Sequence, residues 1–349
     1  MKLKSMVAAF LLACSIIPVS WSSEETLVFA IDVIRHGDRT PEKGLSTVHH
    51  QWAEGLGQLT PVGMQQEYQL GKSKRSLYVD QYHLLPANYT AGTVFVRSTG
   101  LDRTLMSAES FMMGLYPPGT GPHLKAGSAL PDGYQPVPIR TVPGEEEKLL
   151  YPDGPLYHYD HLMEQYVYPA KDWQAKTRTV RPNFTAWSQA TGVKITNIRQ
   201  LFDIGDALYI GRLYHVPPPS GLSEKDVDQI IETGQWAFVR GFQDKHIGKI
   251  TGRLLLKTIT GYFEAAIHNT TTLKYVLFSA HDSTLLSQMS ALGVPLNQRP
   301  HYASNLNFSL FKQGASEYRI RINFNGEPVF VPKCGGASCT LGQFMSLVK

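Results

Sequence analysis

Three apolar segments that each end in charged or ionisable residues constrain the fold of this sequence more than any other feature. They are residues 27–34, 93–96 and 274–279, all of a length and composition typical of buried β-strands. Stretches with helical spacing follow the three segments in turn: residues 60–79, 101–115 and 283–292. Alternating strands and helices predict an α/β fold with a three-layer, doubly wound, mostly parallel sheet.

The first strand ends in Arg35-His36-Gly37-Asp38-Arg39-Thr40-Pro41, which places a histidine between two arginines. Open α/β sheets bind their ligands outside the carboxyl ends of the strands. The two guanidinium groups can grip phosphate oxygens bidentately, and a neutral imidazole can present its lone pair to phosphorus. The alternative is a solvated charged turn. This turn is therefore the first candidate for chemistry on an anion.

The other two strands also end in side chains that could act on a phosphate. The second ends at Arg97, and the third ends at Ala280-His281-Asp282. Each has an alternative without chemistry: a surface ion pair for Arg97, a hydrogen-bonded core histidine for His281 and a helix N-cap for Asp282. Because parallel strands end at one edge of a sheet, we expect all three side chains to lie near His36.

These motifs resemble the active-site signature of the histidine acid phosphatases, the acid phosphatase and phytase branch of the histidine phosphatase superfamily. The resemblance continues through residues 59–66, Val96-Arg97-Ser98-Thr99, Asp102-Arg103-Thr104 and Ser279-Ala280-His281-Asp282, in the order and rough spacing of that family. It covers the chain from about residue 27 to near the C-terminus. It is strongest to the prostatic and lysosomal type.

The resemblance implies a reaction and a role for each candidate residue. His36 would attack phosphorus to form a phosphohistidine, and Asp282 would act as general acid and then general base. Arg35, Arg39 and Arg97 would clamp the phosphate, with His281 as a further donor. The arginines would supply the positive charge, so that no metal or other cofactor is needed. An Asp that must donate a proton predicts activity that peaks at about pH 4.5 to 6.

Other functions remain open at this point. The chain could be a phytase-like inositol polyphosphate phosphatase, or an exported protein that binds phosphate or a polyanion without turnover. A phosphoglycerate-mutase-like phosphotransferase also shares Arg-His-Gly, but its acid is usually a glutamate. The substrate would be a small-molecule or peptide phosphomonoester, and the family includes homodimers. We expect selectivity to be set by residues 42–58 and 116–215.

Composition predicts an interruption of the α/β pattern. Residues 143–235 are mainly helical and rich in aromatic side chains, and we expect them to form a cap subdomain inserted between residues 23–142 and 236–349 of the core. Helices are expected at residues 236–249 and 253–268. Asp203 and Asp206 are too close in sequence to form an acid–base pair, and we expect them to lie on a solvated helix edge.

The N-terminus has the features of an export signal. Residues 1–22 combine Lys2 and Lys4 with a mostly apolar stretch and small residues at a cleavage site, which predicts a cleaved signal peptide and a secreted or periplasmic protein. Lipidation at Cys14 is the alternative. Removing the two lysines lowers the formal net charge from +4 to +2, which gives no reason to expect nucleic-acid binding. No later apolar stretch is long enough for a transmembrane segment.

Two cysteines remain after such a cleavage, Cys334 and Cys339. They flank a Gly-rich loop in an exported context, which predicts a disulfide. The alternative is a metal site, but two thiols with no nearby histidine are an incomplete ligand set for zinc.

Overall fold

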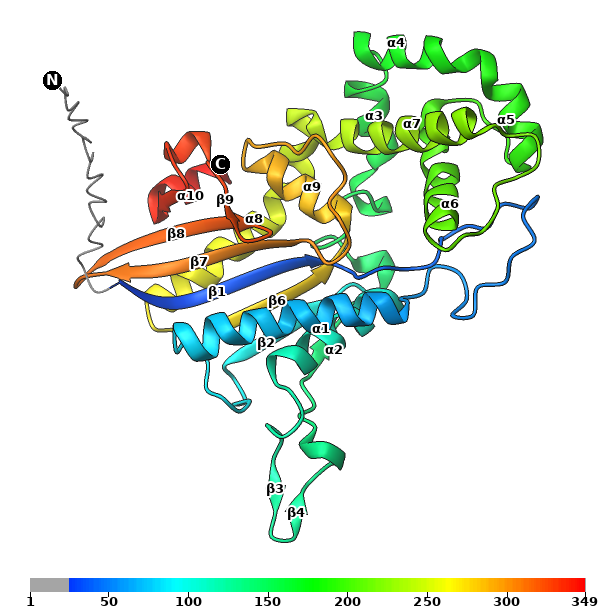
Figure 1. Ribbon diagram of the computed structural model, residues 1–349. Coiled ribbons are helices and arrows are strands. Elements are labelled where there is room, and N and C mark those ends of the chain that lie inside the picture. The colour runs from blue at the N-terminus through cyan, green and yellow to red at the C-terminus, as the bar shows by residue number, and fades with distance from the viewer. Residues whose placement is uncertain (1–24, 349) are drawn as a thin grey trace, which may run out of the picture.

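The fold is organised around a mixed sheet of eight strands, shown by the computed structural model in Figure 1. The model describes residues 25–348, so the predicted signal peptide and Cys14 lie outside the described residues. The order is β10-β8-β7-β1-β6-β2-β5, with β9 paired to β8. The bounds are β1 Glu25–Arg35, β2 Val94–Ser98, β5 Ile139–Arg140, β6 Tyr275–Ala280, β7 Asn305–Gln313, β8 Glu317–Phe324, β9 Glu327–Pro328 and β10 Ser338–Thr340.

The sheet has a parallel half and an antiparallel half. Strands β1, β6, β2 and β5 are parallel, whereas β7, β8, β9 and β10 pair antiparallel, starting with β7 against β1. The α/β class is confirmed, but the sheet is more mixed than the expected mostly parallel arrangement. The cause is the hairpin of β7 and β8, since antiparallel neighbours need only a short turn and no crossover helix.

Helices cover both faces of the sheet, as a three-layer fold requires. On one face, α1 (Pro61–Arg75), the π-helical turn η1 (Ser76–Gln81) and α2 (Asp102–Leu115) pack against Ala30 and Ile34 of β1. On the other face, α8 (Lys245–Ile267), α9 (Asp282–Ala291) and α10 (Leu341–Leu347) bury Phe29, Ile31 and Val33. The alternation along β1 reflects the two-residue period of a strand that is buried on both faces.

The helix boundaries near the site follow local sequence signals. Thr60 caps α1, because its hydroxyl accepts a hydrogen bond from the backbone N–H of Gly63 at 3.1 Å, and Pro61 occupies the first helical position. Helix α9 starts directly at Asp282, so β6 passes into the helix through His281 alone.

A group of helices lies beyond the end of the sheet toward which β1 points (Figure 1). These are α3 (Tyr159–Tyr166), α4 (Lys171–Val180), α5 (Phe184–Thr191), α6 (Leu201–Leu213) and α7 (Glu224–Gln243). They share a hydrophobic cluster that includes Trp173, Phe184 and Trp187. We call residues 143–235 the cap; this division stays a prediction, and residue 235 falls inside α7.

The two helices after residue 235 differ from the expected ones. Instead of a break between residues 249 and 253, α7 ends at Gln243 and α8 begins at Lys245. The side chain of Asp244 sets this break, because it accepts hydrogen bonds from the backbone N–H groups of His246 and Ile247 and so caps α8.

The remaining elements are short. A small hairpin of β3 (His123–Leu124) and β4 (Gly127–Ser128) projects from the core (Figure 1). The 3₁₀ turns are η2 Pro131–Gly133, η3 Gly144–Glu146, η4 Pro155–Tyr157, η5 Arg181–Asn183, η6 Ile198–Gln200 and η7 Pro332–Cys334. The predicted disulfide between Cys334 and Cys339 is present and ties η7 to β10. Among residues 25–348, no helix is both long and apolar enough to cross a membrane.

A buried carboxylate in the middle of β1 connects the sheet to α1. Asp32 is fully buried, and its Oδ1 lies 3.0 Å from Nζ of Lys74. Its other partners are neutral donors: the hydroxyls of Tyr78 and Tyr275 and the amides of Asn305 and Asn307. A buried charge with this many partners is stable only while all of them are in place.

We predict that Lys74→Met lowers the free energy of unfolding by about 3 kcal/mol, because it leaves the carboxylate of Asp32 buried without a counter-charge. The measurement is urea unfolding followed by circular dichroism. The control is Lys72→Met on the exposed side of the same helix, which should change stability by about 0.5 kcal/mol or less. Equal stability of the two variants would contradict the role given to this ion pair.

Candidate active site

The ends of two neighbouring parallel strands bring the predicted residues together. Arg35 at the end of β1 pairs in register with Ala280 at the end of β6, and the backbone N–H of His36 donates to the carbonyl oxygen of Ala280 at 3.1 Å. His281 and Asp282 follow directly, and the rings of His36 and His281 are 5.8 Å apart. This shared edge is the one that the sequence predicted.

The imidazole of His36 is buried and held in one orientation. Its Nδ1 lies 2.8 Å from the carbonyl oxygen of Gly37, so Nδ1 carries the proton and Nε2 keeps its lone pair. Burial, together with the positive charges of Arg103 and Arg35, holds the pKa of His36 well below its usual range. The histidine is therefore neutral and has one nitrogen ready to act as a nucleophile.

Close backbone packing explains the glycine after this histidine. A Cβ on Gly37 would lie 2.3 Å from the carbonyl oxygen of Gly63 in α1, so no larger residue fits without a backbone shift. The next residue, Asp38, is buried and accepts hydrogen bonds from the hydroxyls of Thr60 and Tyr214. Two helices therefore fix the turn that carries His36.

The side chain of Arg35 reaches Asp282, Pro300 and Tyr302. One Nη atom lies 3.1 Å from Oδ2 of Asp282, the other donates to the carbonyl oxygen of Pro300, and the guanidinium lies over the ring of Tyr302 at 4.2 Å. Burial outweighs the attraction of Asp282 and lowers the pKa of Arg35 to about 10, so this arginine remains charged at neutral pH.

Arg39 forms a bidentate ion pair with a carboxylate from the cap. Its two Nη atoms lie 2.8 and 3.2 Å from the oxygens of Asp206 on α6. The expectation of a solvated helix edge is therefore wrong for Asp206, which is buried. Burial alone would raise the pKa of Asp206, but Arg39 and Arg299 lower it to about 2. Asp203 fits the expectation better, since it is half exposed and pairs with Lys43 at 2.6 Å.

The structure does not bring Arg97 to His36. Its guanidinium lies 3.0 Å from both oxygens of Glu147, a carboxylate that also accepts hydrogen bonds from two backbone N–H groups. Strand β2 continues through Ser98, so Arg97 is still inside the strand and its side chain leaves from a face of the sheet. Its position matches the ion pair that was the alternative interpretation.

Arg103 lies in the place that Arg97 was expected to fill. It stands in the first turn of α2, is largely buried, and donates to Glu42 at 3.0 Å. After burial, its charge is the largest contribution to the lowered pKa of both His36 and His281. The matching motif Asp102-Arg103-Thr104 contained this residue, but strand-end reasoning selected Arg97 because it follows the apolar segment directly.

His281 and Asp282 both have structural partners as well as a place at the site. Nε2 of His281 lies 3.0 Å from the hydroxyl oxygen of Thr99, and burial lowers the pKa of His281 to about 3. Asp282 is the first residue of α9 and accepts a hydrogen bond from the backbone N–H of Ser283, but His281, not Asp282, occupies the N-cap position that was the alternative for Asp282. Burial alone would raise the pKa of Asp282, but Arg299 and Arg35 together hold it well below its usual range.

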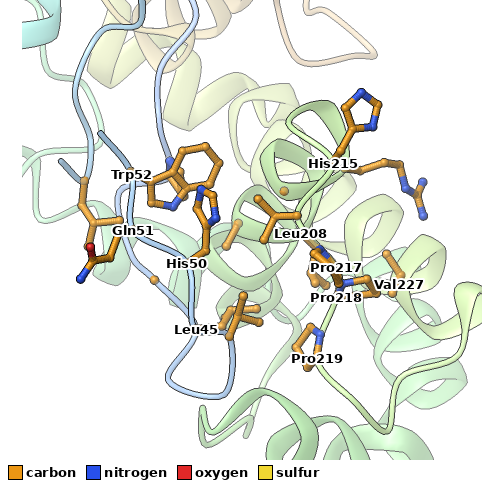
Figure 2. Close-up of a pocket in the computed structure, with 18 of the residues that line it drawn as sticks. Leu45, His50, Gln51, Trp52, Leu208, His215, Pro217, Pro218, Pro219 and Val227 are labelled. Atoms are coloured by element: carbon orange, nitrogen blue, oxygen red, sulfur yellow. The ribbon is translucent and has the colours of Figure 1, made fainter. Parts of the chain in front are cut away.

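One cavity is lined by two of these side chains, and another lies next to the segment that follows Arg39. One, of about 470 Å³, is lined by Arg35 and Arg299 together with aromatic residues such as Trp236 and Tyr302. The other, of about 700 Å³, lies between residues 41–56 and helices α6 and α7. Figure 2 shows the second one, with His50 and Trp52 facing a row of prolines, Pro217, Pro218 and Pro219.

The site offers positive charge from arginines and no arrangement for a metal. Among residues 25–348, no group of three or more His, Cys, Asp or Glu side chains is placed to hold a metal ion. The geometry combines a neutral imidazole, several buried guanidinium groups and a carboxylate, which is a set suited to phosphoryl transfer.

Comparison with known proteins agrees with this geometry. Residues 26–325 match the profile of the histidine phosphatase superfamily (branch 2). A lysosomal acid phosphatase of Xenopus laevis is 32% identical, over 96% of this chain and 78% of its own length. The human prostatic acid phosphatase is 29% identical, over 92% of this chain and 84% of its own length.

Solved structures show the same fold at much lower identity. A phytase from Citrobacter braakii has a TM-score of 0.64 at 15% identity, and the match covers 93% of this chain and 97% of the phytase. The resemblance drawn from the strand-end motifs is confirmed by the sequence relatives. The chain belongs to branch 2 of the histidine phosphatase superfamily.

Proposed function

We propose that this protein is an acid phosphatase that hydrolyses phosphate monoesters through a phosphohistidine at His36. The observation that carries the proposal is the neutral, buried imidazole of His36, held through Nδ1 by the carbonyl of Gly37 among arginine side chains. The relatives named as acid phosphatases support the same reaction. Binding alone would need the arginines but not a nucleophile oriented in this way.

The first chemical step transfers the phosphoryl group to the protein. Nε2 of His36 forms a bond to phosphorus while the bond from phosphorus to the leaving oxygen breaks, and the protonated carboxyl of Asp282 gives its proton to that oxygen. In the second step, Asp282 takes a proton from water, whose oxygen attacks phosphorus and releases His36. Inorganic phosphate is the product.

Arg35, Arg39 and Arg103 form the proposed phosphate clamp, and His281 adds a hydrogen bond. In this assignment Arg103 replaces Arg97. Each clamp arginine has a carboxylate partner in the structure, respectively Asp282, Asp206 and Glu42. Phosphate oxygens accept the same bidentate hydrogen bonds from guanidinium groups, so the substrate competes with these carboxylates for the arginines.

The proton for the leaving group comes in with the substrate. Asp282 is ionised next to Arg35 and Arg299, since its pKa is held well below the usual range. A phosphate monoester keeps one proton below a second pKa of about 6. When the phosphate draws Arg35 away from Asp282 and places a negative charge beside it, the pKa of Asp282 rises, and the carboxylate can take this proton. The rate constant kcat should therefore fall as pH rises through the pKa of this proton in the complex of enzyme and substrate, which agrees in direction with the acidic optimum of about pH 4.5 to 6 expected from the sequence.

The proposed substrate is a small-molecule or peptide phosphomonoester, and the protein is proposed to act after export, as a secreted or periplasmic enzyme. A homodimer and the absence of nucleic-acid binding stay predictions from the family and the charge. The phytase alternative is less favoured, because Glu42 and Asp206 place carboxylates against two of the clamp arginines, where a polyphosphate would meet repulsion.

We predict that the purified protein hydrolyses p-nitrophenyl phosphate with an acidic optimum, that EDTA does not reduce the rate, and that His36→Ala abolishes it. The measurement is the rate from pH 4 to 9 for both proteins, with circular dichroism to confirm that the variant is folded. Activity that survives in His36→Ala, or a rate still rising at pH 8, would contradict the mechanism.

Arg103 and Arg97 provide a matched pair of variants. We predict that Arg103→Ala lowers kcat/KM by about 100-fold or more, because it removes a buried guanidinium from the developing charge. Arg97→Ala should leave kcat/KM within about threefold of the wild type, since Arg97 pairs with Glu147 and is not among the charges that lower the pKa of His36, so the expected loss is mainly in stability. The opposite ranking would restore Arg97 to the clamp.

Glu42→Gln tests the competition between carboxylate and substrate. Removing the negative charge beside Arg39 and Arg103 should lower KM for anionic substrates, and more for an inositol polyphosphate than for p-nitrophenyl phosphate. The measurement is KM for both substrates at pH 5. Asp203→Asn is the control, because its half-exposed carboxylate pairs with Lys43 and none of the clamp arginines. A KM that is unchanged in Glu42→Gln would show that this carboxylate does not compete.

A further inference from the structure

Arg299 is a buried arginine that neither the motifs nor the clamp accounts for. It lies in the connection between α9 and β7, and its side chain is 9% exposed. Its Nε lies 2.5 Å from Oδ2 of Asp282, and one Nη lies 2.9 Å from Oδ1 of Asp206. Its guanidinium packs over the ring of Phe202 at 4.9 Å. Arg299 therefore joins the proposed acid in the core to a carboxylate of the cap.

The site forms a continuous row of alternating charges, and Arg299 stands near its middle. In order, the row is Arg35, Asp282, Arg299, Asp206, Arg39, Glu42 and Arg103. Its arginines are not equivalent. Arg35, Arg39 and Arg103 flank His36, whereas Arg299 is the arginine that joins Asp282 to Asp206.

We propose that Arg299 is a positioning residue that holds Asp282 in place, and ties it to Asp206 of the cap, while the substrate phosphate engages Arg35. This inference rests on the proposed phosphatase function. Asp282 has two arginine partners, and the clamp needs one of them. Without Arg299, the carboxyl of Asp282 would lose its remaining ion pair when Arg35 turns to the phosphate.

The position of Arg299 also affects the strength of the acid. When Asp282 gives its proton to the leaving oxygen, a carboxylate forms next to the guanidinium of Arg299, which stabilises it. Arg299 thus makes Asp282 a stronger acid and keeps the pH optimum low. The other charged or titratable groups that act on Asp282 are Arg35, His36, Arg103, Asp153 and His281.

Leucine is the variant that separates these effects from folding. In Arg299→Leu, Asp206 keeps Arg39 and Asp282 keeps Arg35, so neither carboxylate is left without a partner, and the apolar side chain can pack against Phe202. Arg299→Lys keeps the positive charge but loses the separate Nε and Nη donors that reach the two carboxylates. Arg240→Leu is the control, since Arg240 pairs with Asp172 within the group of helices α3–α7.

The experiment measures kcat and KM from pH 4 to 9 on p-nitrophenyl phosphate and on an alkyl phosphate, with inhibition by inorganic phosphate. For Arg299→Leu we expect the fall of kcat with rising pH to occur about one pH unit higher than in the wild type, because loss of the guanidinium raises the pKa of Asp282. We also expect turnover of the alkyl phosphate, which has the poorer leaving group, to fall by about tenfold. Arg299→Lys should keep this fall of kcat close to the wild-type position, and Arg240→Leu should match the wild type.

The inference would be overturned if the falling limb of the kcat profile against pH did not move in Arg299→Leu. If, with this limb unchanged, inorganic phosphate also inhibited the variant more weakly, Arg299 would be part of the clamp. If Arg299→Leu does not fold, Arg299→Lys is used instead. The inference is supported if the ratio of turnover of the alkyl phosphate to turnover of p-nitrophenyl phosphate equals that of the wild type. It is overturned if this ratio falls while the falling limb of the kcat profile against pH stays in place. Failure of the proposed function would look different, because the wild type itself would then have no activity.

Discussion

Mutual neutralisation of charge inside a largely buried site is the constraint on which the rest of this structure depends. Arg35 and Arg39 are almost fully buried, and a buried charge without a partner is strongly unfavourable. Asp282, Asp206 and Glu42 provide the partners. Phosphate accepts the same bidentate hydrogen bonds as these carboxylates. A site in which each buried arginine is paired with a carboxylate is therefore also suited to bind a phosphate group.

The residues that could be predicted from the sequence are those fixed by the ends of strands. An apolar segment shows where a buried strand runs, and parallel neighbours in a sheet end at the same edge. This is sufficient to bring His36 and Asp282 together although they are far apart in sequence, since Arg35 and Ala280 are partners in register. The same rule failed for Arg97. Strand β2 continues one residue beyond Arg97, so the side chain of Arg97 points from a face of the sheet and not from its edge. An apolar pattern does not determine the end of a strand to within one residue.

The residues that the sequence did not predict belong to ion pairs between distant segments. Asp206 lies 167 residues from Arg39, and Arg299 lies 93 residues from Asp206. Neither pair has a periodic or motif signal, because their contact depends on how the cap packs against the core. The mixed sheet has a similar origin, since β7 pairs with β1 across more than 270 residues of sequence, a contact without any local sequence signal. Long-range packing, and not local propensity, decides such features.

In the proposed mechanism the cap takes part in the chemistry, because one of its carboxylates holds two arginines of the core. Asp206 on α6 pairs with Arg39 in the turn that carries His36 and with Arg299, which also pairs with Asp282. A substrate phosphate that engages Arg39 weakens the first of these ties and leaves the second, so α6 stays connected to the core through Arg299 while the substrate is bound. The same competition applies to inorganic phosphate. Because Asp206 and Asp282 regain their arginines when the product leaves, the charges that hold the site together also favour release of the product.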